Sequence, residues 1–324
     1  MAAARTFDQK RARLRELATA PEGEARAELK KLLTDKNGYL VGESAEMAQK
    51  LELSALIPDL VAAFPRFLVD GAKTDMGCFG KNRLIEALLA FDAYEADTYL
   101  LGLRCRQPEG AIPFRVDTAA GLRGLCAHAL FHIRHPTALL DVAPLLFDPE
   151  PVTRSEAASA LGESGMDGAA AALHVKVLSG DSEPDVLGAA YKGLLRILPG
   201  RYLPVVEKAL SSEEDGPVEA AALALGESRA PGAFEALSRA TREQGMFRRT
   251  SESLLLGIAL LRSDEALSFL TDMVEKAPES QAVEALSALA LHRHDESLTA
   301  RLVALAKKRG SRRLTERLHE KFNA

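Results

Sequence analysis

A single sequence pattern recurs through the second half of the chain, and it restricts the possible folds more than any other feature. Its clearest copies are EAASALGESGMDGAAAAL, EAAALALGESRAPGAFEAL and SLLLGIALLRSDEALSFL. When the copies are aligned, five residues occupy equivalent positions at spacings of 32, 32, 35 and 31 residues: Gly162, Leu194, Gly226, Leu261 and His292. A period of roughly 30–35 residues with helical spacing of apolar residues is typical of stacked helix pairs. The repeat therefore predicts an all-α solenoid.

Turn-forming residues divide the rest of the chain into short helical segments. Glycine and proline recur at intervals of roughly 12–18 residues, and long strand-like alternation is absent. This rhythm is typical of a short helix, a turn and a second short helix. We therefore predict an N-terminal capping helix at 6–19, followed by about nine helix pairs. The predicted pairs span residues 24–51, 54–91, 94–133, 136–163, 168–197, 201–228, 232–261, 264–292 and 296–322.

The second helix of each pair is expected to supply most of the core. In the unit at 168–200 we expect it to bury Val186, Ala189, Ala190, Leu194 and Leu195. Paired alanines allow neighbouring helices to approach closely, whereas a large residue there would overpack the layer boundary at a cost of about 1–3 kcal/mol.

Charge is distributed unevenly over the four segments that we predict. These are a basic N-terminal helix or cap at 1–20, irregular repeats with two longer loops at 21–135, regular repeats at 136–300 and a basic C-terminal cap at 301–324. The whole chain carries a net charge of −5, although both ends are basic. Such asymmetry can mark a contact surface for a charged partner. We interpret the basic ends as solvated caps, because terminal repeats need a polar outer face.

Cellular location is constrained by three absences in the sequence. The sequence contains no run of about 18 apolar residues, so we expect no transmembrane helix. The charged N-terminal segment lacks the apolar core of a signal peptide. Cys78, Cys105 and Cys126 are odd in number and include no CxxC pair, which argues against a disulfide framework or a structural zinc site. We interpret the three cysteines as small buried residues of a cytoplasmic protein.

The repeated segments resemble HEAT repeats, particularly the bacterial HEAT-like type also found in phycobilin lyase subunits. The shared pattern is an acidic or Pro-bearing turn, then Val, Ala-Ala and Ala-Leu-Gly, and it is best carried by 148–162, 181–195 and 215–226. The resemblance covers 136–300 well and 24–135 loosely. It implies a right-handed α-solenoid whose second helices line a concave face, but little about activity, because such folds serve many roles.

One feature of the family pattern is missing from the regular repeats. HEAT units usually place an arginine just after the valine and form an Asp–Arg ladder between layers, but Leu187 and Glu219 occupy that position here. Only Arg154, two residues after Val152, could take the part of the ladder arginine. We therefore expect the stack to depend on apolar packing more than on a polar ladder.

The catalytic members of this fold class are poorly matched. Deoxyhypusine hydroxylase uses repeated His-Glu pairs to hold iron, whereas His319-Glu320 is the only such pair in this sequence. HEAT-like DNA glycosylases have a basic groove lined with tryptophan. This chain has no Trp, and its middle segment is acidic. A phycobilin lyase-type role would need a bilin-bearing partner that the sequence does not reveal. We expect no enzymatic activity.

Two local motifs suggest ligands but fit simpler structural roles. Gly80-Lys81 resembles the end of a P-loop, but Asp75 stands where its first glycine should be and Asn82 replaces Ser or Thr. We interpret Asp75 as a helix cap. His128 and His132 have the i, i+4 spacing that can chelate a metal. No acidic third ligand follows at fixed spacing, so we interpret both as packed or rim histidines and expect no metal or cofactor.

The two long loops are the places where the repeat period breaks. They lie at 70–80 and 106–114, and long loops in a solenoid collect on one face, often the binding face. The alternative is tolerated loop drift, because long surface loops cost little. The predicted partner-binding residues lie at or near the starts of second helices around these loops: Lys81, Arg115, Asp117, Arg123 and Arg154.

The leading functional hypothesis is a non-enzymatic scaffold that binds a protein or peptide partner on its concave face. The acidic middle predicts a partner of basic or mixed charge and binding that salt weakens. One alternative is nucleic-acid binding through the basic ends, which the acidic middle makes a poor fit. Another is an accessory or lyase-like role on a modified partner. No membrane partner is expected, and the sequence does not determine an oligomeric state.

Overall fold

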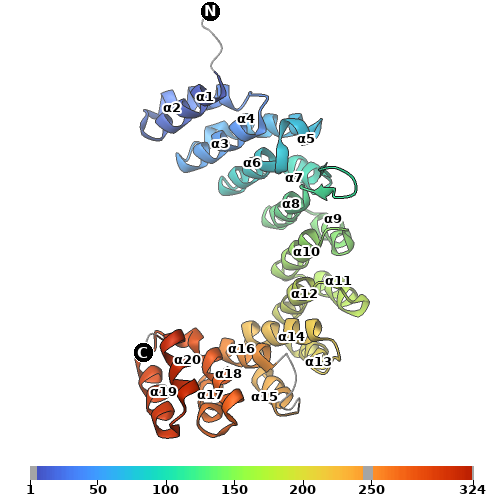
Figure 1. The fold of residues 1–324 in the computed structure, drawn as a ribbon. Coiled ribbons are helices and arrows are strands. Elements are labelled where there is room, and N and C mark those ends of the chain that lie inside the picture. Colours follow the sequence, from blue (N-terminus) through green and yellow to red (C-terminus); the bar gives the residue numbers. More distant parts are fainter. Residues whose placement is uncertain (1–5, 244–250, 323–324) are drawn as a thin grey trace, which may run out of the picture. The chain divides into compact units, whose positions relative to one another are not determined.

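The computed structural model describes residues 6–243 and 251–322, and helices make up 78% of the structure. The chain divides into two compact units, residues 1–160 and 161–324 (Figure 1). Helix α10 (Pro151–Glu163) crosses the boundary between them. Among the described residues, no helix combines the length and apolar character needed to span a membrane.

The first unit contains ten α-helices if α10 is included, with short 3-10 turns between some of them. Its other helices are α1 (Phe7–Glu16), α2 (Glu22–Leu32), α3 (Gly38–Lys50), α4 (Ile57–Ala63), α5 (Gly71–Thr74), α6 (Phe79–Ala90), α7 (Ala96–Leu103), α8 (Ala120–His132) and α9 (Ala138–Val142). The second unit holds α11 (Asp167–Ser179), α12 (Pro184–Ile197), α13 (Pro199–Ala209), α14 (Asp215–Ser228), α15 (Ala233–Glu243), α16 (Ser251–Leu261), α17 (Asp264–Lys276), α18 (Glu279–Leu289), α19 (Glu296–Arg309) and α20 (Arg312–Phe322).

The described helices confirm the predicted α-solenoid. Helix α1 is the capping helix, and each of the nine predicted pairs is present within the described ranges, from α2–α3 to α19–α20. The second helices also pack on one another from layer to layer, as in α3 on α6 and in α12, α14 and α16. Each unit is therefore a stack of helix pairs. The four-segment division of the chain stays a prediction.

Small residues bring the second helices into close contact. The expected core residues of α12 and the alanines Ala221 and Ala222 of α14 are buried. Glycines extend this principle, since a Cβ atom added to Gly226 would lie 2.3 Å from the carbonyl oxygen of Gly257. Gly226, one of the equivalent positions of the repeat, therefore acts in helix packing.

Candidate functional site

The two long loops of the first unit contact each other. The first contains α5 and a 3-10 turn (Met76–Cys78), and the second forms an antiparallel hairpin of β1 (Pro108–Glu109) and β2 (Val116–Asp117). The backbone N–H of Gly77 donates to Glu109 Oε1 over 2.7 Å, and Gln107 Nε2 donates to the carbonyl oxygen of Asp75 over 2.8 Å. The loops that break the repeat therefore form one continuous structure.

Lys81 and Asp75 form a buried ion pair beneath these loops. The Asp75 carboxylate accepts hydrogen bonds from the backbone N–H groups of Gly80 and Lys81, at 2.6 and 3.1 Å. Asp75 therefore caps the N-terminus of α6, as predicted. Lys81 Nζ lies 2.8 Å from Asp75 Oδ2 and also donates to Gln107 Oε1 and the carbonyl oxygen of Phe67. Its ammonium group is thus fully occupied by protein acceptors.

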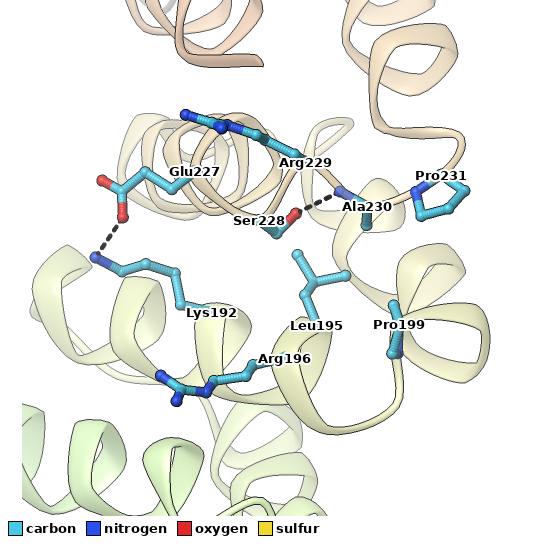
Figure 2. Close-up of a pocket in the computed structure, with 9 residues that line it drawn as sticks. All are labelled: Lys192, Leu195, Arg196, Pro199, Glu227, Ser228, Arg229, Ala230 and Pro231. Atoms are coloured by element: carbon cyan, nitrogen blue, oxygen red, sulfur yellow. Dashed lines mark hydrogen bonds and ion pairs between the residues drawn. The ribbon is translucent and has the colours of Figure 1, made fainter. Parts of the chain in front are cut away.

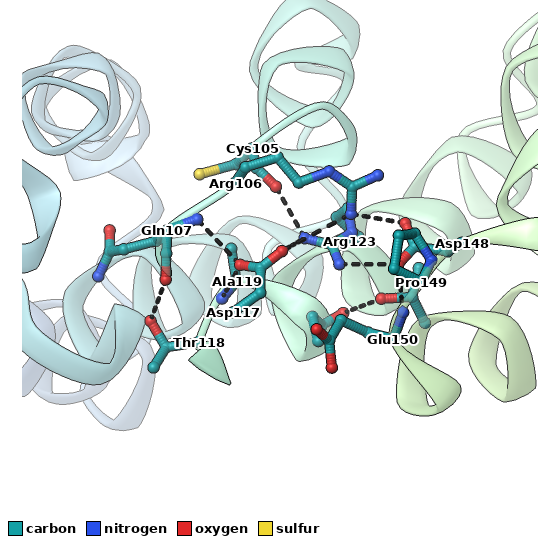
Figure 3. A network of polar contacts seen from close by, with 12 residues as sticks. Cys105, Arg106, Gln107, Asp117, Thr118, Ala119, Arg123, Asp148, Pro149 and Glu150 are labelled. Carbon is teal, nitrogen blue, oxygen red and sulfur yellow. Dashed lines mark hydrogen bonds and ion pairs between the residues drawn. The ribbon is translucent and has the colours of Figure 1, made fainter. Parts of the chain in front are cut away.

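Arg123 is the centre of a second buried network, shown in Figure 3. Its Nη1 donates to Asp117 Oδ2 over 2.7 Å and its Nη2 to Asp148 Oδ1 over 3.0 Å. Asp117 belongs to the hairpin and Asp148 precedes α10, so Arg123 links one layer to the next. Arg106 adds an ion pair to Asp148 over 2.6 Å. The side chains of Arg123 and Asp148 are both 0% exposed.

In the first unit, these contacts correct the expectation that the stack depends on apolar packing more than on a polar ladder. An acidic residue and a cation six positions later recur at Asp75 and Lys81 and at Asp117 and Arg123. Arg154 follows Asp148 at the same spacing, but its Nη1 donates to backbone carbonyls of Asp148 and Pro149. The family pattern places an arginine at a fixed position relative to valine, whereas these layers share a fixed spacing of six residues from acid to cation.

Farther along the chain the ladder changes its chemistry. Asp181 pairs with Lys176 of the preceding helix over 2.6 Å, and both side chains are almost completely buried. The positions directly after the repeat valines Val186 and Val218 hold Leu187 and Glu219, and Leu187 is buried. Apolar packing therefore replaces the ladder cation at Leu187, so the sequence-based expectation fits that layer of the second unit.

The five predicted partner-binding residues occupy very different environments. Lys81 and Arg123 are fully buried and ion-paired, so neither side chain is accessible to a partner in this structure. Asp117 and Arg154 are half-buried within the same networks. Arg115 alone of the five is exposed, in the loop of the hairpin. Partner contact by the accessible residues stays a prediction, whereas Lys81 and Arg123 hold the fold together.

The exposed apolar residues of the hairpin are a feature that the sequence-based prediction missed. We call residues 110–116 the finger, which projects beside α7 (Figure 1). Ile112, Phe114 and Val116 are 79%, 83% and 60% exposed, and Met76 in the adjoining loop is 74% exposed. The signal for it in the sequence is this apolar run within a loop bounded by Gly and Pro, whereas the predicted partner-binding residues are all charged.

The base of the finger is fixed by ionised groups. Burial alone would raise the pKa of Asp117, but hydrogen bonds from the Gln107 and Ala119 backbone N–H groups and the Arg123 guanidinium lower it overall. The pKa of Glu109 is also lowered, because hydrogen bonds from Gln107, Gly77 and Thr118 outweigh its desolvation. Both carboxylates are therefore charged at neutral pH and hold the two strands in place.

The cysteines and histidines that suggested other chemistry have structural partners. All three cysteines are free and buried, as predicted. The thiols of Cys78 and Cys105 interact, and this hydrogen bond raises the pKa of Cys78 while lowering that of Cys105. His128 Nε2 lies 3.1 Å from Glu156 and His132 Nε2 lies 2.9 Å from Asp92. Among the described residues, no group of three His, Cys, Asp or Glu side chains has a metal-binding arrangement.

Comparisons with known proteins find solved structures of low sequence identity and no matching sequence family. No protein-family model and no curated protein sequence matches this chain. An engineered protein of known structure is 18% identical, with a TM-score of 0.40 over 100% of this chain and 97% of its own. The complex of CpcE and CpcF of phycocyanin lyase from Nostoc sp. PCC7120 is 18% identical, with a TM-score of 0.38 over 78% and 94% of the respective chains. Human deoxyhypusine hydroxylase in complex with glycerol is 14% identical, with a TM-score of 0.28 over 90% and 92%.

Proposed function

We propose that the chain is a non-enzymatic helical-repeat scaffold that binds a protein or peptide partner through the finger. The observation that carries this proposal is the exposure of Ile112, Phe114 and Val116 on a hairpin whose base is held by buried ion pairs. Burying one such side chain contributes about 1.5–3 kcal/mol. An ordered base reduces the conformational entropy that binding would otherwise cost.

The charges around the finger favour a partner of mixed character. Arg115 supplies an exposed cation beside Phe114, while Asp70 in the adjoining loop is an exposed acid. A partner would therefore bury an apolar centre and match both signs at the rim. Because rim charges are screened by salt, we expect salt to slow association more than it accelerates dissociation.

Site-specific cross-linking tests the proposal. A photoreactive phenylalanine at position 114 should attach to a discrete partner in cells that make the protein, and the same probe at Leu178 should not. Leu178 is a matched control because its side chain is 74% exposed on a helix of the second unit. The paired change Ile112→Ser and Phe114→Ser should abolish capture of that partner, whereas Leu178→Ser should preserve it.

Two results would contradict this assignment. One is equal cross-linking from positions 114 and 178, and the other is unchanged capture by the doubly substituted finger. Arg115→Glu separates the charged contribution, because this side chain is exposed and its reversal leaves the buried network intact. Reversal of Arg123 has no such use, since it would destroy the interlayer ion pairs.

Nucleic-acid binding through the basic ends remains an alternative that no contact favours. Several of these cations pair with carboxylates of neighbouring helices, as Lys10 does with Asp35, Arg11 with Glu43 and Lys308 with Glu275. Such pairing suits polar caps and leaves less positive charge for phosphates. A steeply salt-dependent gel shift that disappears when residues 1–20 and 301–324 are removed would support the alternative. The lyase-like role would instead require an absorbing group on a partner.

A further inference from the structure

A cavity of about 510 Å³ lies in the second unit, far along the chain from the finger. It opens where α12 and α14 end, at Ile197 and Ser228. One part of its lining is apolar and another is basic. The lining residues are Lys192, Leu195, Arg196, Pro199, Glu227, Ser228, Arg229, Ala230 and Pro231.

Two arginines on the basic side have no ion-pair partner among the described residues. Arg196 and Arg229 are both exposed, and Figure 2 shows them on opposite sides of the pair formed by Lys192 and Glu227. That pair spans 3.0 Å, so Glu227 is already neutralised by Lys192. Leu195, Pro199, Ala230 and Pro231 lie away from the charged groups in the same view, which leaves the cavity amphipathic.

The backbone conformation of Arg229 decides which substitution can test this residue without disturbing the fold. This residue has a φ of 49° and ends α14 in the left-handed conformation, a position that glycine usually occupies. A non-glycine residue is disfavoured there, because its Cβ approaches the following carbonyl oxygen. Six other described non-glycine residues share this conformation, so it is the position of Arg229 in the cavity lining that matters for binding.

We propose that this cavity binds the carboxylate of an acidic residue flanked by apolar residues in an extended peptide. The basic side offers three cations against one carboxylate, which leaves a surplus of positive charge for an acidic side chain. The C-termini of α12 and α14 are offset by the N-termini of α13 at Pro199 and of α15 just after Pro231, so the helix dipoles add little net charge. The planar guanidinium groups provide the donor geometry that carboxylates favour, and the apolar lining accommodates the flanking side chains.

The cavity and the finger belong to different units, so either could bind its ligand while the other does not. Loss of cross-linking at the finger would leave the cavity proposal intact. Loss of peptide binding at the cavity would likewise leave the finger proposal intact. The two sites can therefore be tested separately in the full-length protein.

Saturation-transfer NMR with small peptides tests the cavity directly. The probes are acetyl-Leu-Glu-Leu-amide, its glutamine analogue and inorganic phosphate, each titrated into the full chain at constant low salt. The glutamate peptide should bind roughly tenfold more tightly than the glutamine peptide, since a charge-assisted hydrogen bond is worth more than a neutral one. Arg196→Gln and Arg229→Gly should each weaken its binding by about the same factor.

Arg262→Gly is the matched control for Arg229→Gly. Arg262 has a φ of 55° just after α16 and is exposed, but it does not line the cavity. Both glycine variants should remain folded, because glycine adopts this conformation more readily than arginine. Equal binding of the glutamate and glutamine peptides, unchanged binding by both cavity variants, or displacement of the peptide by equimolar phosphate would each overturn the proposal.

Discussion

At the scale of single residues, a charged side chain can be a structural element. Lys81 and Arg123 are residue types that usually lie on the surface, but both are buried against carboxylates of the loops. Removing one partner of a buried ion pair leaves the other charge uncompensated, which costs far more than losing an exposed pair. Arg115 and Arg123 are close in sequence, but we expect their substitution to change the free energy of unfolding by very different amounts.

The change Arg123→Met tests this difference while retaining side-chain volume. It should lower the free energy of unfolding by about 3–5 kcal/mol, because Asp117 and the buried Asp148 both lose the Arg123 cation and Asp148 keeps only its pair with Arg106. Arg115→Ala should change it by less than about 0.5 kcal/mol, since the side chain is exposed. Urea unfolding followed by circular dichroism measures both values. Similar losses in the two variants would show that the network contributes little.

At the scale of elements, helix-to-helix distance depends on which glycines face a neighbour. Gly226 of α14 faces the backbone of Gly257 in α16, whereas a Cβ atom added to Gly188 of α12 would meet nothing closer than 3.9 Å. The two glycines are both helical, so their intrinsic propensities are alike. Only the neighbouring helix distinguishes them.

Replacing each glycine by alanine should have opposite effects. Gly226→Ala should destabilise the protein by about 1–3 kcal/mol, because the new methyl group would overlap the Gly257 backbone. Gly188→Ala should stabilise it by roughly 0.5–1 kcal/mol through helix propensity. Thermal melting of the two variants alongside the parent checks the signs. Destabilisation of equal size by both would contradict the close approach of α14 and α16.

At the scale of the whole molecule, stability should depend on carboxylates that are ionised by their contacts. The pKa values of Asp117, Asp35 and Glu156 are all lowered in the folded state. Burial opposes the shift in Asp117 and Asp35, while hydrogen bonds and cations cause it. For Glu156 the hydrogen bond from His128 is the main cause. Groups with lowered folded-state pKa values stabilise the native protein only where they are ionised.

These shifts predict a loss of stability in acid. The stabilisation is fully present above the unfolded-state values, about 3.9 for Asp and 4.3 for Glu, and is lost as the pH falls through the lower folded-state values. The difference in unfolding free energy between the parent and Asp117→Asn should therefore narrow between pH 6 and pH 3. Urea midpoints over this range provide the measurement. A difference that stays constant with pH would mean that Asp117 does not contribute through its charge.

The sequence by itself determined the helix pairs, because apolar periodicity, alanine-rich second helices and turn residues are signals within short segments of the chain. Stacking then buries the apolar faces of helices that these signals already specify. It also located the two loops that interrupt the period. Only the tertiary structure decided that these loops join, that Lys81 is buried against one carboxylate and Arg123 against two, and that Phe114 faces solvent. The reason is physical, since the contacts that join the loops and complete the surroundings of these side chains link residues about 25–40 positions apart in the chain. The local sequence at each residue does not contain that information.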